Sequence, residues 1–165
     1  MPIRRARAAD LPSIVAIYNS IVAGRQVTAD LSPVTVDDRL TWFDAHQQPH
    51  RPMVVLCDEQ DGVLAWATFS DYYPRKAYDI TAEISLYVAE DQRGKRLGIA
   101  LLEHMLALAP SLNIKNVVAV IFAHNTPSVA LFEKYGFGLW GTLPNVCDLE
   151  TMEADIVLLG KRLDA

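Results

Sequence analysis

A basic loop at residues 93–98 separates a strand-like segment that ends near Val88 from an amphipathic helical segment that begins near Gly98. A helix N-terminus presents unpaired N–H groups and partial positive charge, and glycines let the backbone approach an anion. Three cationic side chains add local charge here: Arg93, Lys95 and Arg96. These residue types fit either a phosphate-binding loop or a solvated basic turn. The loop lacks a G-K-[ST] ending and a three-glycine spacing, so neither a P-loop nor a dinucleotide fingerprint is expected.

The segments around this loop predict a mixed α+β layer in the order β-α-α-β-β-β-α-β-α-β-β. The continuous apolar run at 117–122 is typical of a strand buried on both faces. Thr126 and Pro127 suit the N-cap and first residue of a helix, and Pro110 should end or kink the preceding one. The first two helices are expected to line one side of a cleft. The predicted strands are 3–5, 53–56, 63–69, 81–88, 117–122, 137–143 and 154–162; the predicted helices begin near Asp10, Thr35, Gly98 and Thr126.

Composition narrows the classes of protein. With 165 residues, of which 51% are hydrophobic, the chain fits a single domain, 1–165. A net charge of -5 argues against a nucleic-acid partner. Because no segment has the basic and apolar pattern of a signal peptide or the length of a membrane span, we expect no membrane partner and a cytoplasmic location. Cys57 and Cys147 are expected to be buried structural thiols, and the four histidines show no metal-ligand spacing.

A family resemblance rests on the order of several motifs. A strand, the loop 93–98 opening a helix, an apolar strand, Asn125, and a helix that ends in EKYGF at 133–137 resemble the GCN5-related N-acetyltransferase (GNAT) superfamily nearly end to end. Segments 77–83, 117–121 and 125–129, with 141–143 and 17–19, resemble its phosphinothricin and methionine-sulfoximine acetyltransferase subgroup.

The resemblance implies a mixed, mostly antiparallel seven-stranded sheet flanked by about four helices, with strands 4 and 5 splayed to admit acetyl-CoA. The pantetheine arm would pair with the main chain of strand 4, and the pyrophosphate would lie on the backbone amides of the loop. No metal is implied, and relatives often form homodimers. The implied cofactor-binding residues are Leu86, Tyr87, Val88, Arg93, Gly94, Lys95, Arg96, Leu97, Gly98, Ile99, Asn125 and Ser128.

Glu83 is the candidate catalytic base. Acetyl transfer from a thioester needs the substrate's ammonium deprotonated, and Glu83 is a carboxylate in an otherwise apolar strand that matches the subgroup's glutamate. Partial burial would raise its pKa toward neutrality; the alternative is an edge-strand carboxylate that faces solvent. Arg75 and Tyr78 are candidates for gripping an acidic group of the substrate, or they belong to an ordinary surface loop. Tyr73 walls the same cleft or simply packs, and Ser85 completes the predicted substrate set.

Three positions depart from the family pattern. Arg96 stands where most relatives have glycine, so the loop must adopt its conformation with a side chain present. Phe132 replaces a tyrosine or histidine and cannot donate a proton to the departing thiolate. The acidic segment at 148–155 replaces a Lys/Gly/Trp-containing segment and could reshape the substrate cleft or a dimer contact.

These features predict an acetyl-CoA-dependent N-acetyltransferase for a small amino-acid-like amine, such as phosphinothricin or methionine sulfoximine or sulfone. Two other hypotheses stay open. The substrate could be a protein N-terminus or lysine, or the chain could be a non-catalytic acyl-CoA-binding regulator, which Arg96 and Phe132 favour.

Overall fold

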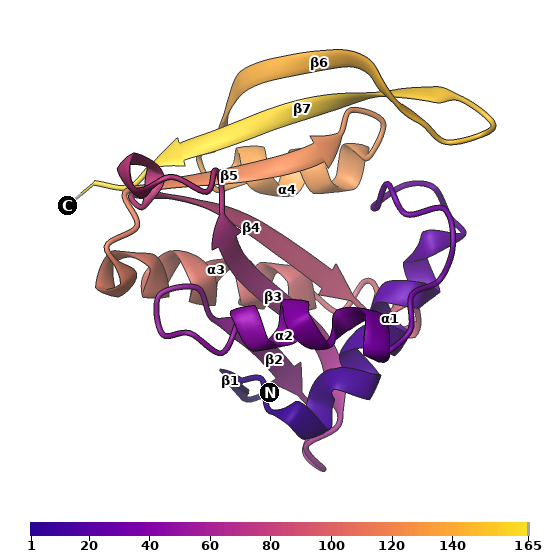
Figure 1. Cartoon of the computed structure of the whole chain (residues 1–165), viewed down its shortest axis with the longest axis vertical. Helices are drawn as coiled ribbons and strands as arrows, with labels where there is room; N and C mark the ends of the chain where they lie inside the picture. Colours follow the sequence, from indigo (N-terminus) through magenta and orange to yellow (C-terminus); the bar gives the residue numbers. More distant parts are fainter. Residues whose placement is uncertain (165) are drawn as a thin grey trace.

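The computed structural model describes residues 1–164, so Ala165 of the predicted domain lies outside the described residues (Figure 1). The predicted order of strands and helices is confirmed. The strands are β1 (Ile3–Arg5), β2 (Met53–Cys57), β3 (Val63–Asp71), β4 (Thr81–Val88), β5 (Asn116–Phe122), β6 (Gly138–Asp148) and β7 (Glu153–Arg162). The α-helices are α1 (Leu11–Val22), α2 (Leu40–Ala45), α3 (Leu97–Leu108) and α4 (Thr126–Lys134).

All seven strands form one sheet in the order β1-β2-β3-β4-β5-β7-β6, as the resemblance implied. Every neighbouring pair is antiparallel except β4 and β5. The parallel pair is held only at its start, through Thr81 with Asn116, Ala82 with Val117 and Glu83 with Val118. Beyond these residues the two strands diverge in Figure 1. The splay leaves the edge of β4 from Ile84 to Val88 without a paired strand on the β5 side.

The alternation of side chains along β4 directs two different sets of residues to the two faces of the sheet. Ala82, Ile84, Leu86 and Val88 pack in the core beneath α3, whereas Tyr87 packs with Trp66 in the core beneath α1. Glu83 and Ser85 therefore share the α1 and α2 face with Tyr87. In Figure 1, α1 and α2 lie in front of the sheet and α3 and α4 lie behind it. The first two helices thus lie over the polar side of β4.

Local signals in the sequence correctly predicted several element ends. The Thr35 and Asp38 capping box forms, with hydrogen bonds of 2.9 and 3.1 Å between each backbone N–H and the other side chain. Helix α3 ends at Leu108, and Pro110 lies in a short 3-10 turn that follows. The N-cap of α4, however, is Asn125 and not Thr126, since the Asn125 side chain accepts from the backbone N–H of Ser128.

Two burial predictions were wrong in part. Val120 of β5 is 40% exposed and lies beyond Val118, the last residue of β5 that pairs with β4. Cys57 is fully buried as expected, whereas Cys147, near the end of β6, is only half-buried. Among residues 1–164, no helix combines the length and apolarity needed to cross a bilayer, and no group of three or more acidic, histidine or cysteine side chains could hold a metal ion.

Candidate active site

Two hollows flank β4, and we call them the long groove and the aromatic pocket. The long groove has a volume of about 640 Å³ and runs from the loop before α3 to the start of α4. Eleven of the twelve residues predicted to bind the cofactor line it, and Lys95 does not; its ammonium donates to Gln92 Oε1 at 2.8 Å. The groove is completed by Ile21, Gln26, Val27, Gln92, Pro127 and Leu131, which were not predicted.

The anion-binding capacity of the groove lies at the N-terminus of α3. The first helical i to i−4 hydrogen bond runs from Ala100 to Arg96, so the backbone N–H groups of Leu97, Gly98 and Ile99 have no partner within the helix. Arg96, the N-cap, has a left-handed backbone with φ of 62°. These amides, together with Arg93 and Arg96, form a concentration of positive potential in the groove wall.

The middle of the groove combines an apolar wall with a free strand edge. Leu86, Tyr87 and Val88 line it from the part of β4 that β5 does not pair. An extended chain could hydrogen-bond to this edge as an added strand would. Opposite, the side-chain oxygen of Asn125 accepts from the Ser128 N–H at 3.4 Å. The cap uses the carbonyl of Asn125 and leaves its NH₂ group to donate into the groove.

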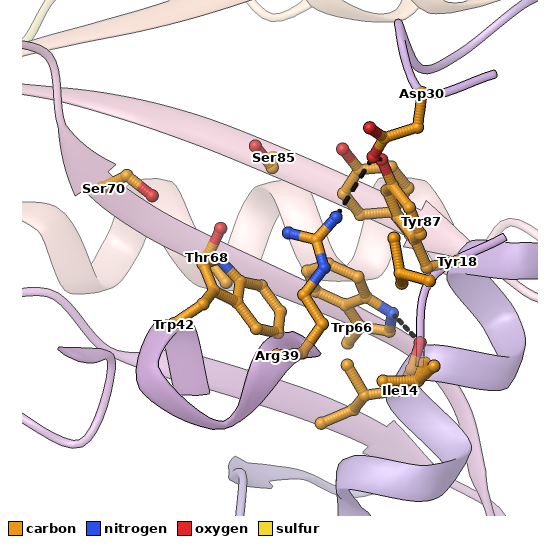
Figure 2. A pocket seen from close by; sticks show the side chains of 12 residues that line it. Ile14, Tyr18, Asp30, Arg39, Trp42, Trp66, Thr68, Ser70, Ser85 and Tyr87 are labelled. Atoms are coloured by element: carbon orange, nitrogen blue, oxygen red, sulfur yellow. Dashed lines mark hydrogen bonds and ion pairs between the residues drawn. The ribbon is translucent and has the colours of Figure 1, made fainter. Parts of the chain in front are cut away.

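The aromatic pocket lies on the other side of Tyr87, between α1, α2 and the sheet, and has a volume of about 200 Å³ (Figure 2). Four aromatic rings form its walls: Tyr18, Trp42, Trp66 and Tyr87. Trp66 is fixed by a hydrogen bond of 3.1 Å from its indole N–H to the carbonyl of Ile14. The other lining residues are Ile14, Val15, Asp30, Val34, Arg39, Thr68, Ser70 and Ser85.

A charged network closes one end of this pocket. The Tyr18 hydroxyl donates to Asp30, and the Arg39 guanidinium donates to the same carboxylate at 3.1 Å. The guanidinium carbon lies 4.8 Å from the ring centre of Tyr18 and 5.3 Å from that of Trp42. Burial and the bond to Asp30 raise the pKa of Tyr18, so its hydroxyl stays protonated at neutral pH.

Glu83 lies in a row of paired residues that ends at this pocket. Across β3 and β4, Ser70 pairs with Glu83, Thr68 with Ser85 and Trp66 with Tyr87, all on the α1 and α2 face. Glu83 does not line the pocket itself but lies two residues before Ser85 on the same face of β4. It is half-buried, and burial raises its pKa above the ordinary value of 4.5. Such a shift makes a carboxylate a better proton acceptor near neutral pH.

Tyr87 is the residue shared by the two hollows. Burial raises its pKa well above the usual range, and the nearby Tyr18 and Glu83 act in the same direction. Its hydroxyl therefore stays neutral and able to donate a hydrogen bond. A molecule in the long groove and a molecule in the aromatic pocket would meet beside this ring.

The loop between β3 and β4 carries the other predicted substrate residues. Tyr73, Arg75 and Tyr78 gather there, with the Arg75 guanidinium 6.0 Å from the Tyr73 ring centre and the Tyr73 and Tyr78 rings 5.3 Å apart. All three are exposed, and none lines the aromatic pocket. The buried Arg51 holds both ends of this loop, through Asp71 at 2.8 Å and the carbonyl of Asp79 at 3.0 Å.

The two remaining departures from the family pattern lie away from the pocket. Phe132 is buried, packs edge-to-face on Phe137 at 4.9 Å, and lines neither hollow. The segment 148–155 includes the turn between β6 and β7, where Glu150 pairs with Arg25 at 3.2 Å. Arg25 precedes Gln26 and Val27, so this segment reaches the rim of the long groove and not the aromatic pocket.

Most of the pocket residues were missed at the sequence level. Arg39 and Trp42 lie three residues apart at the start of α2, which places them on one helix face. Trp66, Thr68 and Ser70 alternate along β3 on the same face as Glu83. Both patterns were present, but each is equally typical of ordinary core packing.

Residues 15–137 match the model of the acetyltransferase (GNAT) family. YwnH of Bacillus subtilis, whose name proposes a phosphinothricin acetyltransferase, is 46% identical over 99% of both chains. The L-methionine sulfoximine/L-methionine sulfone acetyltransferase of Pseudomonas paraeruginosa is 35% identical over 98% of this chain and 94% of its own. The crystal structure of a phosphinothricin acetyltransferase from Sinorhizobium meliloti in complex with acetyl-CoA matches with a TM-score of 0.92, at 30% identity, over 98% of this chain and 88% of its own.

Proposed function

The chain belongs to the acetyltransferase (GNAT) family, and from that membership we propose that it transfers the acetyl group of acetyl-CoA to the amine of a small amino-acid-like substrate. Phosphinothricin and methionine sulfoximine or sulfone, the substrates in the names of its relatives, are the leading examples. The observation that carries the proposal is the meeting of the long groove and the aromatic pocket at Tyr87, on the same face of β4 as Ser85 and Glu83.

The residues of the long groove suit acetyl-CoA. The free amides at Leu97 to Ile99, with Arg93 and Arg96, would hold the pyrophosphate. The unpaired edge of β4 and the NH₂ group of Asn125 would hold the amides of the pantetheine arm. Acetyl-CoA supplies a thioester whose acyl carbon is already activated for attack.

Glu83 acts as the general base in this proposal. An ammonium must lose a proton before its nitrogen can attack, and Glu83 accepts it directly or through one water. Ser85 and Thr68, which pair across β3 and β4, orient the amine next to the carboxylate. The aromatic walls exclude water from the reacting groups. Transfer is then direct, with no covalent intermediate on the protein.

Phe132 has no proton to give, and its burial away from both hollows supports a reaction without a dedicated acid at that position. A thiol has an ordinary pKa of about 8.5, so a thiolate can leave without full protonation near neutral pH.

Glu83→Gln tests the proposal through CoA release with phosphinothricin, methionine sulfone and the common amino acids. We expect kcat/KM to fall by about 100-fold or more. For the parent enzyme, kcat/KM should rise with pH and reach a plateau above an apparent pKa higher than 4.5, because only ionised Glu83 accepts a proton. This rise of kcat/KM with pH should be absent in Glu83→Gln.

The affinity of Glu83→Gln for acetyl-CoA is the control. It should equal that of the parent, since Glu83 does not line the long groove. The variant should also fold. Because burial raises the pKa of Glu83 in the folded state, the glutamate contributes stability below pH 4.5 that is lost as pH rises through the folded-state pKa, so glutamine should be at least as stable at pH 7 to 8. An unchanged pH profile in Glu83→Gln would remove Glu83 from the mechanism.

The two other hypotheses predict different outcomes. A protein substrate would give turnover with peptides and none with free amino acids, whereas a pocket of about 200 Å³ suits one side chain. A non-catalytic regulator would bind acetyl-CoA and release no CoA with any amine. Either result would overturn the proposed activity.

We also propose that the enzyme works in the cytoplasm, as its intracellular co-substrate suggests, and that it forms a homodimer. Support for the homodimer comes from β6, the edge strand of the sheet, which exposes several large apolar side chains: Leu139, Trp140, Leu143 and Val146.

A further inference from the structure

We propose that Arg39 is a specificity-determining residue whose guanidinium binds oxygen atoms at the far end of the substrate's side chain. The enzyme would then prefer amino acids whose side chain ends in a sulfonyl, sulfoximine or phosphinyl group over the same skeleton without those oxygens. This inference rests on the proposed function and adds the property of the side chain that the aromatic pocket selects.

Arg39 is held rigidly with donors to spare. One terminal nitrogen donates to Asp30 at 3.1 Å, and this is the one side-chain hydrogen bond that Arg39 makes within residues 1–164. Its flat faces pack against the rings of Tyr18 and Trp42. In Figure 2 one side of the guanidinium points to Asp30 and the other into the pocket. A guanidinium has five N–H groups in a fixed fork, so donors remain for a ligand with paired oxygens.

The opposite end of the pocket suits an amine. Thr68 lines the pocket, and no side-chain hydrogen bond occupies its hydroxyl within the described chain. Ser85 and Ser70 flank it, and Glu83 is the residue paired with Ser70. No buried side-chain oxygen lacks a partner within the described chain, so the Thr68 hydroxyl is open to the pocket, where a polar group of a ligand can bond to it. The pocket thus has hydroxyl acceptors near the proposed base and a cation at the other end.

The size and charge of the pocket also limit which group at the end of the substrate's side chain can bind there. About 200 Å³ is roughly the liquid volume of six or seven waters, at about 30 Å³ each, which admits one amino-acid side chain. Because Asp30 pairs with Arg39, the two form a neutral unit. A neutral sulfonyl or a singly charged phosphinyl group suits such a unit better than a group with two full charges, which would be left under-compensated in an aromatic pocket.

The role of Arg39 differs from that predicted for Arg75. Arg75 is exposed on the loop between β3 and β4 and does not line the pocket. In an amino acid the α-carboxylate is next to the amine, so in this proposal it remains close to Glu83. Arg39 would then bind the substrate's side chain, and Arg75 would bind the α-carboxylate that all amino acids share.

Methionine sulfone and methionine provide the test, because they differ only by two side-chain oxygens. The measured quantity is the ratio of kcat/KM for methionine sulfone to that for methionine, obtained from CoA release. In the parent enzyme we expect a ratio well above one. Arg39→Gln should lower it by at least about tenfold, the effect of losing hydrogen bonds from a charged donor. Arg39→Lys keeps the charge without the fork and should give an intermediate ratio.

Arg75→Gln is the matched control. It should lower kcat/KM for both substrates alike and leave their ratio unchanged. Acetyl-CoA affinity shows that each variant is folded, because neither arginine lines the long groove. A ratio that stays at the parent value in Arg39→Gln, with acetyl-CoA affinity retained, would overturn the role of Arg39 alone. If the parent enzyme acetylates neither compound nor any other amino acid, the proposed function itself fails.

Discussion

Arg96 keeps a left-handed backbone, with φ of 62° and ψ of 23°, at the point where the loop turns into α3. Residues with a Cβ pay about 1 to 2 kcal/mol for this conformation, and glycine does not. The charge of Arg96 faces the groove where the proposed pyrophosphate would lie. The Arg96 side chain therefore costs stability through its backbone conformation and contributes affinity for an anion through its charge.

Arg96→Gly should raise the free energy of unfolding by up to about 1 kcal/mol and weaken acetyl-CoA binding several-fold. Arg96→Ala removes the same charge but keeps the Cβ, so it should weaken binding equally without the gain in stability. Urea unfolding and calorimetric titration measure the two effects. Equal stability of the glycine and alanine variants would contradict the strain at this position.

At the scale of elements, the groove depends on how closely the N-terminus of α3 approaches β4 and α4. A Cβ at Gly98 would lie 3.8 Å from Leu131 Cδ2 and 3.9 Å from Val88 Cγ2, both ordinary contacts. The fold therefore tolerates a side chain there. All three residues line the long groove, so the added methyl group would occupy space beside the free amides.

Gly98→Ala should leave the protein as stable as the parent or stabilise it by up to about 1 kcal/mol, because alanine favours helix. It should raise the Kd for acetyl-CoA about tenfold, which corresponds to about 1.4 kcal/mol. Gly94→Ala is the control for stability. An added Cβ would have nothing within 4 Å, but the φ of 79° disfavours alanine, so this variant should be less stable than the parent, unlike Gly98→Ala. Unchanged acetyl-CoA affinity in Gly98→Ala would show that the cofactor does not approach α3 this closely.

At the scale of the whole molecule, the sheet ends on one side at β6, whose outer edge is unpaired within the described chain. Exposed apolar side chains on an edge strand favour association with another chain. Val146, 51% exposed, lies where the pairing of β6 with β7 shifts register. This edge is the surface that we expect the second copy of a homodimer to cover.

Val146→Asp should shift the protein from dimer to monomer, because an aspartate buried in such an interface would lack a partner for its charge. Sedimentation velocity over a range of concentrations measures the shift. Leu40→Asp introduces the same charge at an exposed leucine on α2 and should leave the dimer intact. A parent protein that sediments as a monomer at all concentrations would refute the homodimer.

Features that depend on neighbours in the chain could be predicted from the sequence. The strand Thr81–Val88, the helix start after Arg96 and the Thr35 capping box follow from local periodicity, charge and hydrogen bonding within a few residues. The residues of the long groove were expected from the family resemblance, because the residue types of the loop at 93–98 alone fitted either a phosphate-binding loop or a solvated basic turn. Glu83 was singled out because it is a carboxylate in an otherwise apolar strand and matches the glutamate of the subgroup that the sequence resembles.

The aromatic pocket depended on the tertiary structure. Tyr18, Arg39, Thr68 and Tyr87 come from four separate elements, and each alone has the pattern of ordinary packing or an ordinary surface. Packing of α1 and α2 over β3 and β4 brings them together, while Arg51 binds both ends of the loop that carries Arg75. The sequence by itself therefore determined the order of elements and the position of a basic loop before a helix, which stays the predicted binding site for the cofactor. Only the tertiary structure decided which cation faces the pocket, because that choice arises from contacts between segments far apart in the chain.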